Sequence, residues 1–344
     1  MTIHFRRERI SADLLDPRIG FARTTHDNME FRYDPLTGRS TRLAHIGAIR
    51  PQKLHYDDYN GENKGYCPFC PPQMEQATSI FPKELIPEGR LVRGDTTLIA
   101  NIAPYDTYSG LVVLSEKHVL TIEDMTVNLL RDAFGLAAEF MERVKKHDPL
   151  IPYYFMGWNY MPPSGGGLVH AHIQVFGSRD PGNVFFSDLH ALSRYKKETG
   201  HHFWPDYLAE EQKRGERYLA QIGELHWFVP FAPLGFMGDV MAILPRPCTP
   251  AHFREELLDD FVAGLSRLFT FYKDKGVYSF NASIHFSPDR NSEYPLVVRF
   301  SPRTFLNKKY YPPDANFFHI MLQQPVCVVW PEETAELIRP YFTA

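Results

Sequence analysis

The stretch that decides the fold is residues 165–176, which read GGGLVHAHIQVF. Three glycines lead into alternating polar and apolar residues, a pattern typical of a β-strand. Alternate residues of a strand share one face, so His170, His172 and Gln174 are expected to project together. The apolar residues around them indicate a buried strand, in which polar side chains need partners.

The three polar residues of this strand are informative only as a set. With 15 His in 344 residues, a His-x-His pair is expected ~0.65 times by chance, so the pair alone decides nothing. Requiring Gln two residues later lowers the chance expectation to ~0.015. The set therefore favours a functional cluster over three polar side chains on a solvated strand.

A second cluster begins with Cys67 and Cys70, a spacing that four cysteines produce ~0.05 times by chance. The surrounding segment 65–72, GYCPFCPP, is irregular and rich in proline, whereas a thioredoxin-like redox pair opens a helix. Zinc binding is therefore favoured over redox chemistry. A tetrahedral structural zinc site needs two more ligands, and His118 and His170 are available.

The composition is that of a globular chain. Its 344 residues are 44% apolar and 14% aromatic, enough to bury the cores of about two domains. A net charge of -4 offers no general surface for polyanions, so nucleic acid is not expected as a partner. Residues 1–15 are charged where a signal peptide is apolar, and no later stretch has 18 uninterrupted apolar residues. We therefore expect a cytoplasmic protein that does not enter a membrane.

The order strand, strand, helix, strand, strand occurs twice, about 130 residues apart. In the first copy these elements are expected at 97–101, 110–115, 121–146, 153–160 and 168–177. In the second copy they are expected at 225–231, 240–244, 253–275, 278–287 and 295–301. The pattern predicts an α+β fold of two related units, residues 1–221 and 222–344, each with strand pairs and one long helix.

Two further segments belong to the first unit. Residues 29–46 predict a hairpin, because Pro35 and Gly38 form a turn between two strand-like runs. Residues 184–221 carry many charges at helical spacing, and we interpret them as a solvated linker helix.

The chain resembles the galactose-1-phosphate uridylyltransferase family of the histidine-triad superfamily, whose members carry two histidine-triad-like halves in one polypeptide. Residues 33–38, YDPLTG, resemble the family's N-terminal hairpin motif, and the basic positions Arg50 and Lys53 follow it. Further residues match the family in order, namely the zinc ligands Cys67, Cys70, His118 and His170, the nucleotide-pocket strand end Asn101–Tyr105, and the active-site Asn159. The resemblance implies two tandem units, each an antiparallel sheet with a long helix.

The resemblance also implies a double displacement on a nucleoside diphosphate sugar. His172 would attack the α-phosphorus, expel a sugar 1-phosphate and form a nucleotidyl-histidine that a second phosphate resolves. Gln174 would donate to a phosphoryl oxygen, and the amides of Gly165, Gly166 and Gly167 would cradle phosphate. Arg50 and Lys53 would balance the substrate's charge. Zn²⁺ with four protein ligands would be structural and would fix the strand that carries His172.

The second unit differs from the first at the matching positions. Val297 and Arg299 stand where the first unit has His170 and His172, so this copy lacks a nucleophile, and we expect it to form a pocket wall and recognise sugar. The family adds a second metal here, held by a carboxylate and several His. Only His285 remains, with Asp188 as a candidate carboxylate, so we predict that the second metal is absent. Members of the family commonly complete their sites across a homodimer, which we also expect.

Three functions stay open. The first is uridylyl transfer between UDP-glucose and a hexose 1-phosphate. The second is an ADP-sugar phosphorylase, adenylyltransferase or dinucleoside polyphosphate phosphorylase that uses the same His172, because Ile102 and Ala103 replace an acidic and an aromatic residue of the uridylyltransferases. The third is a nucleotide- or metal-binding protein without turnover, since the second unit already lacks the nucleophile.

Overall fold

The structure is a computed structural model that describes residues 3–44, 56–59, 66–307 and 313–343. Its main element is a ten-stranded sheet in which every neighbouring pair is antiparallel. In chain order its strands are β4 (Leu91–Arg93), β5 (Thr96–Ala100), β6 (Tyr108–Val113), β7 (Tyr153–Tyr160), β8 (His172–Ser178), β9 (Tyr218–Ile222), β10 (Leu225–Phe228), β11 (Val240–Leu244), β12 (Phe280–His285) and β13 (Leu296–Pro302).

The spatial order of the strands confirms two related α+β units. The order is β4-β5-β6-β8-β7-β12-β13-β11-β10-β9, so each unit repeats the same arrangement outward from the centre of the sheet. The two units join where β7 pairs with β12, which makes one continuous sheet. The boundary expected after residue 221 falls inside β9, and the division into domains stays a prediction.

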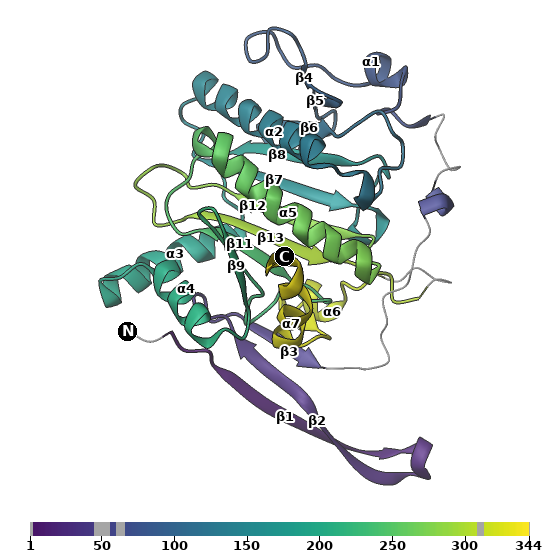
Figure 1. Ribbon diagram of the computed structural model, residues 1–344, viewed down its shortest axis with the longest axis vertical. Coiled ribbons are helices and arrows are strands. Elements are labelled where there is room, and N and C mark those ends of the chain that lie inside the picture. The colour runs from purple at the N-terminus through teal and green to yellow at the C-terminus, as the bar shows by residue number, and fades with distance from the viewer. Residues whose placement is uncertain (1–2, 45–55, 60–65, 308–312, 344) are drawn as a thin grey trace.

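The two long helices, α2 (Val127–His147) and α5 (Glu255–Lys275), lie side by side on one face of this sheet (Figure 1). Their apolar faces and the inner side chains of the strands form the main core. The expected start of the first helix at Thr121 was wrong. Thr121 and Asp124 form a capping box around a 3₁₀ turn, and the helix begins after Thr126, whose hydroxyl accepts the amide hydrogen of Leu129.

Residues 184–221 are not a solvated linker helix. They form α3 (Asn183–Thr199), α4 (Phe203–Arg214) and most of β9. One face of the two helices is apolar and packs against the sheet as a second core, made by Phe185, Leu192, Phe203, Trp204, Tyr207, Phe228, Met241 and Val297. Most of the charged residues that suggested a solvated helix lie on the opposite, exposed faces, whereas Glu211 and Arg217 are fully buried and form an ion pair at 3.0 Å.

The smaller sheet contains β1 (Arg7–Asp16), β2 (Ala22–Tyr33), β3 (Ser40–Ala44) and β14 (Val326–Cys327). The expected hairpin is confirmed by the antiparallel pairing of β2 with β3. The hairpin of β1 and β2 projects from the body of the molecule (Figure 1).

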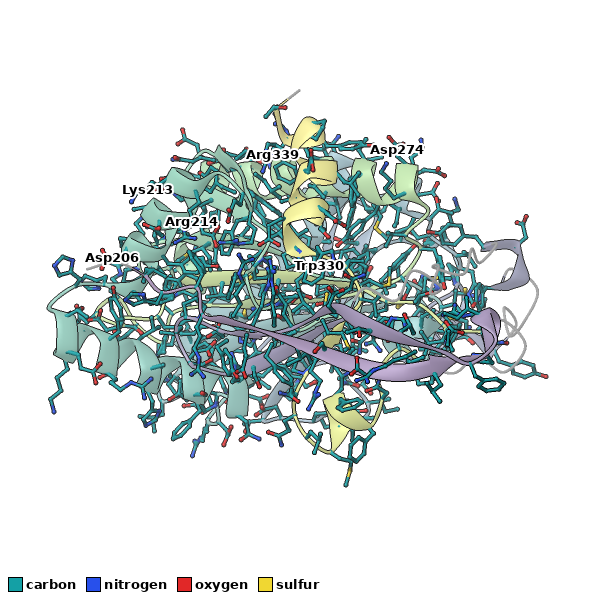
Figure 2. All side chains as sticks on the ribbon, turned by 90° about the horizontal axis from the view of Figure 1, so that it is seen from below. Asp206, Lys213, Arg214, Asp274, Trp330 and Arg339 are labelled. Atoms are coloured by element: carbon teal, nitrogen blue, oxygen red, sulfur yellow. The ribbon has the colours of Figure 1, made fainter. Side chains whose placement is uncertain are left out.

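The described residues also form the α-helices α1 (Gln73–Ala77), α6 (Phe317–Ile320) and α7 (Pro331–Thr343). The last of these is tied to the end of α4, because Arg339 donates to the carbonyls of Gly215 and Glu216 (Figure 2). Among the described residues, no helix has both the length and the apolar character needed to cross a membrane.

Candidate functional site

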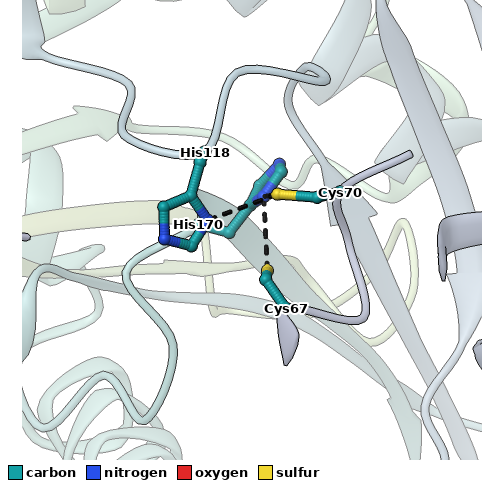
Figure 3. Close-up of side chains that lie close together, drawn as sticks. All are labelled: Cys67, Cys70, His118 and His170. Carbon is teal, nitrogen blue, oxygen red and sulfur yellow. Dashed lines mark hydrogen bonds between the residues drawn. The ribbon is translucent and has the colours of Figure 1, made fainter. Parts of the chain in front are cut away.

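A buried cluster of four metal-ligand side chains lies at the start of β8 (Figure 3). Cys67, Cys70, His118 and His170 each place one ligand atom within 4.8 Å of the others. The distances from Sγ to Nδ1 are 3.3 Å for Cys70 and His118, 3.5 Å for Cys70 and His170, and 3.6 Å for Cys67 and His170. A tetrahedral zinc ion with the usual bond lengths requires about 3.6 Å for such a pair. The donor set and its spacing therefore suit a metal such as zinc.

The fold brings these ligands together from three places. The cysteine loop packs against β5 and β6 through Ile99, Leu111 and Val113. His170 bonds through Nε2 to the carbonyl of Ser115 at 2.6 Å, which turns Nδ1 toward the cysteines. Burial lowers the pKa of His170 to about 4, against the opposing effect of this hydrogen bond. The imidazole is therefore neutral at neutral pH, as a metal ligand must be.

His172 follows the cluster as the first residue of β8. Its Nδ1 bonds to the carbonyl oxygen of His170 at 2.8 Å. A carbonyl can only accept, so Nδ1 carries the proton and Nε2 keeps its lone pair. Burial lowers the pKa of His172, while the bond to His170 opposes the shift. The side chain is therefore a neutral imidazole whose Nε2 is unprotonated, and its role as a nucleophile stays a prediction.

Phe69 connects the metal cluster to His172. The centroid of its ring lies 5.8 Å from that of His170 and 5.2 Å from that of His172, in edge-on contact with both. The residue is 4% exposed, so its ring is held in place. Sequence reasoning missed this role, although the position of Phe69 between the two cysteines was a signal.

Asn159 is held by the second unit. Asn281 on β12 donates through Nδ2 to Asn159 Oδ1 at 2.6 Å and to the Ser164 carbonyl at 2.9 Å. Arg303 in turn donates to Asn281 Oδ1. The contact occupies Oδ1 of Asn159 and not its amide NH₂, and binding of substrate by that NH₂ stays a prediction. Sequence reasoning missed Asn281, although Asn281, Ser283 and His285 alternate along their strand as the residues of β8 do.

The glycine loop lies next to Asn159. A Cβ on Gly166 would come within 3.0 Å of the Asn159 carbonyl oxygen, so only glycine allows this close approach. Gly165 has a φ of +87° and, like Gly167, is exposed. Gly165 and Gly166 are therefore required for the path of the loop, and the contacts of the three glycines with phosphate stay a prediction.

The structure says less about the other residues that we expected to bind substrate. The side chain of Asn101 stabilises the turn that follows it, since Oδ1 accepts from the Ala103 amide at 3.0 Å and Nδ2 donates to Ser109 Oγ at 3.2 Å. Ser109 pairs across the sheet with Phe176, two positions beyond Gln174 on the same face. Arg50 and Lys53 lie outside the described residues. The contacts of these residues and of Gln174 with substrate stay predictions.

The candidate residues for a second metal make other contacts. Asp188 Oδ1 accepts from Arg39 Nη2 at 3.0 Å, and burial raises the pKa of this carboxyl to about 6. The ring of His285 lies between those of Phe155 and Phe185, with centroids 5.7 Å and 5.5 Å away. The absence of a second metal stays a prediction.

We expect His285→Gln to reduce the loss of stability in acid. Burial lowers the pKa of His285 to about 4, and the nearby Arg299 adds to the shift. The unfolded chain therefore binds more protons than the folded chain between the unfolded pKa and this value, and stability falls as the pH drops through this range. Between about pH 7 and about pH 4.5 the variant should lose about 2 kcal/mol less than the parent protein in urea unfolding.

A matched control for this prediction is His26→Gln, which changes an exposed histidine of β2. This variant should lose as much stability in acid as the parent protein. An equal loss in His285→Gln would contradict the prediction.

Comparisons with known proteins agree with this fold. No family model matches the chain. An uncharacterized protein from Archaeoglobus fulgidus is 30% identical over 313 residues, which covers 90% of this chain and 92% of that protein. Among solved structures, an ADP-glucose phosphorylase from Arabidopsis thaliana with bound ADP-glucose is 17% identical with a TM-score of 0.68, covering 90% of this chain and 98% of that one. A uridylyltransferase is 19% identical with a TM-score of 0.65, covering 91% and 98%. The chain therefore belongs to one family with the Archaeoglobus fulgidus protein, and it shares the fold of the ADP-glucose phosphorylase and of the uridylyltransferase.

Proposed function

We propose that this protein is a nucleotidyltransferase that acts on nucleoside diphosphate sugars through a nucleotidyl-histidine at His172. The observation that carries the proposal is the hydrogen bond from His172 Nδ1 to the carbonyl of His170. His170 belongs to the metal-ligand cluster, so the cluster fixes the carbonyl that orients the nucleophile. The fold shared with a uridylyltransferase and an ADP-glucose phosphorylase supports the same class of chemistry.

The reaction would proceed in two balanced steps. In the first, Nε2 of His172 forms a bond to the α-phosphorus, and the bond from that phosphorus to the bridging oxygen breaks. The oxygen leaves with the electron pair as a sugar 1-phosphate. In the second, a phosphate oxygen of the acceptor attacks the same phosphorus and the N–P bond breaks.

The proton on Nδ1 stays in place throughout. It makes the nucleotidyl-imidazole cationic, and a cationic imidazole is a good leaving group in the second step. The carbonyl of His170 accepts a hydrogen bond from this cation and so stabilises it. The low pKa of His172 keeps Nε2 unprotonated before the attack.

Other residues would bind the phosphates. Gln174 lies two residues along the same face of β8 and would donate to a non-bridging oxygen. The proposed phosphate and nucleotide contacts are Arg50, Lys53, Asn101, Asn159, Gly165, Gly166 and Gly167. Zn²⁺ held by Cys67, Cys70, His118 and His170 would have no open position, so it would stabilise the fold and take no part in the chemistry.

For the donor we propose UDP-glucose, with a hexose 1-phosphate as acceptor. Adenylyl transfer from ADP-glucose is the second candidate. The reason for this second candidate is Ile102, which is 77% exposed at the expected nucleotide pocket and offers no carboxylate to a ribose.

Covalent labelling tests the proposal. The protein would be incubated separately with UDP-glucose and ADP-glucose that carry a radiolabelled α-phosphorus, and the protein-bound label would be measured before and after acid. Acid-labile label from UDP-glucose supports uridylyl transfer, and label from ADP-glucose alone supports the second candidate. No label from either donor would favour a nucleotide-binding protein without turnover and contradict the proposal. The homodimer also stays a proposal, which light scattering would check.

A further inference from the structure

A cavity of about 320 Å³ lies between the two units, on the side of the large sheet that carries the long helices. The first unit lines it with Tyr154 of β7 and with Met141, Glu142, Lys145 and Lys146 of α2. The second unit lines it with residues 249–251 and 288–290. Ligand pockets occur preferentially where two such units meet.

This cavity is separate from the proposed site at His172. Gly157 of β7 pairs with Gln174 of β8, so the odd-numbered residues of β7 share a face with Gln174 and His172. Successive side chains of a strand point to opposite faces, so Tyr154 projects from the other face of the sheet. A ligand in the cavity would therefore lie behind the strands that carry the proposed site.

The floor of the cavity contains an unpaired hydroxyl. Tyr154 is 3% exposed, and its hydroxyl has no hydrogen-bond partner among the residues that the structure describes. Burial raises the pKa of this hydroxyl, so it keeps its proton and can donate. A buried donor without a partner is unfavourable and rare in folded proteins. An acceptor oxygen of a ligand would satisfy it.

The walls of the cavity are apolar. Met141 and Pro250 are buried and Pro288 is half-buried, and the ring of Tyr154 adds a further apolar surface. Pockets of 300–1,000 Å³ hold drug-sized ligands, so a cavity at the lower end of this range fits one aromatic ring with its substituents. Such pockets combine apolar walls with a few polar groups that fix the orientation of the ligand.

The rim of the cavity carries positive charge. Lys146 and Arg290 are exposed, and neither forms an ion pair within the described parts of the chain. Lys145 has less freedom, because its Nζ donates to the carbonyls of Pro149 at 2.8 Å and Ile151 at 3.1 Å. Lys146 and Arg290 are therefore the cations that remain for an anionic ligand.

The acidic side chains around the cavity do not cancel this charge. Glu142 is already paired with Arg254, which does not line the cavity. Asp289 Oδ1 accepts from the amide of Asn291 at 2.7 Å. Three cationic side chains thus face one carboxylate that has no cationic partner among the described residues.

We propose that this cavity binds a small aromatic acid that carries a polar oxygen at the end opposite its carboxylate. The ring lies between the apolar walls, and the inner oxygen accepts the hydrogen bond of Tyr154. The carboxylate lies at the rim near Lys146 and Arg290. This binding site does not depend on the proposed function, because none of its residues belongs to the proposed catalytic centre.

Calorimetric titration of the full-length protein with 4-hydroxybenzoate and with benzoate tests the proposal. Both probes place a carboxylate at the rim, but only 4-hydroxybenzoate brings an acceptor to Tyr154. The parent protein should therefore bind 4-hydroxybenzoate about fivefold more tightly than benzoate. An excess of UDP should leave the probe bound, because the cavity is separate from the proposed nucleotide site.

Tyr154→Phe removes the hydroxyl and should bind the two probes equally. This variant should fold, because the change deletes a polar group that has no partner. Tyr272→Phe is the matched control. The hydroxyl of Tyr272 is also buried without a partner among the described residues, but Tyr272 does not line this cavity, so its variant should keep the preference of the parent protein.

Lys146→Gln tests the rim and should weaken the binding of both probes about threefold while the preference for 4-hydroxybenzoate remains. Lys275→Gln makes the same change at an exposed position at the end of α5 and should bind as the parent protein does. The proposal would be overturned if the parent protein bound neither probe or bound both equally. Displacement of the probe by UDP, or an unchanged preference in folded Tyr154→Phe, would overturn it as well.

Discussion

We expect His172→Gly to abolish the proposed nucleotidyl transfer, with a loss of about 10⁴-fold or more in turnover. The variant lacks the only nitrogen that the proposed mechanism uses, so no N–P bond forms and no label remains on the protein after incubation with UDP-glucose or ADP-glucose. The measurement combines labelling with a steady-state assay of sugar 1-phosphate release.

The fold of this variant should survive. His172 is the first residue of β8, where glycine costs about 1 kcal/mol, and the metal ligands are untouched. Zinc content and the melting temperature should therefore stay close to those of the parent protein. His26→Gly is the matched control, because it makes the same change on the exposed strand β2. Full activity in His172→Gly would sink the double-displacement mechanism.

The candidate site residues that could be predicted from the sequence are mainly those that lie close together along the chain. The alternation of His170, His172 and Gln174 follows from strand geometry, and the spacing of Cys67 and Cys70 from the needs of a metal. His118 was one of the available histidines, and the resemblance to a family then placed it among the ligands. All four members of the metal cluster lie together in the structure.

Contacts that depend on the pairing of distant strands could not be predicted in this way. Asn159 and Asn281 are 122 residues apart and meet only because β7 pairs with β12 at the centre of the sheet. Gly157 likewise lies between Gln174 of β8 and Ser283 of β12 only because β7 pairs with both of these strands. Composition was also misleading in α3 and α4. Their many charged residues led to the prediction of a solvated helix, although both helices have buried apolar residues on one face.

The second large effect is expected when one of the proposed zinc ligands is replaced. Cys67→Ser replaces a thiolate ligand with a hydroxyl, which binds zinc poorly, and we expect a loss of about 100-fold in zinc affinity. Binding to the folded state alone stabilises it by mass action, so this loss costs about 3 kcal/mol at a fixed zinc concentration that saturates the parent protein. The measurements are zinc content by elemental analysis and unfolding in urea with and without a chelator.

The other two cysteines provide an internal control for this prediction. Cys248 and Cys327 are fully buried outside the cluster, and burial raises the pKa of both thiols to about 12, so they remain protonated. Cys248→Ser should lower stability through its buried hydroxyl but leave the zinc content unchanged. Cys67→Ser should in addition slow transfer, because the loop that carries Phe69 and the carbonyl of His170 no longer hold His172 in one orientation. Full zinc content in Cys67→Ser would contradict the ligand set, and unchanged transfer in a zinc-depleted variant would contradict the coupling between the metal and the nucleophile.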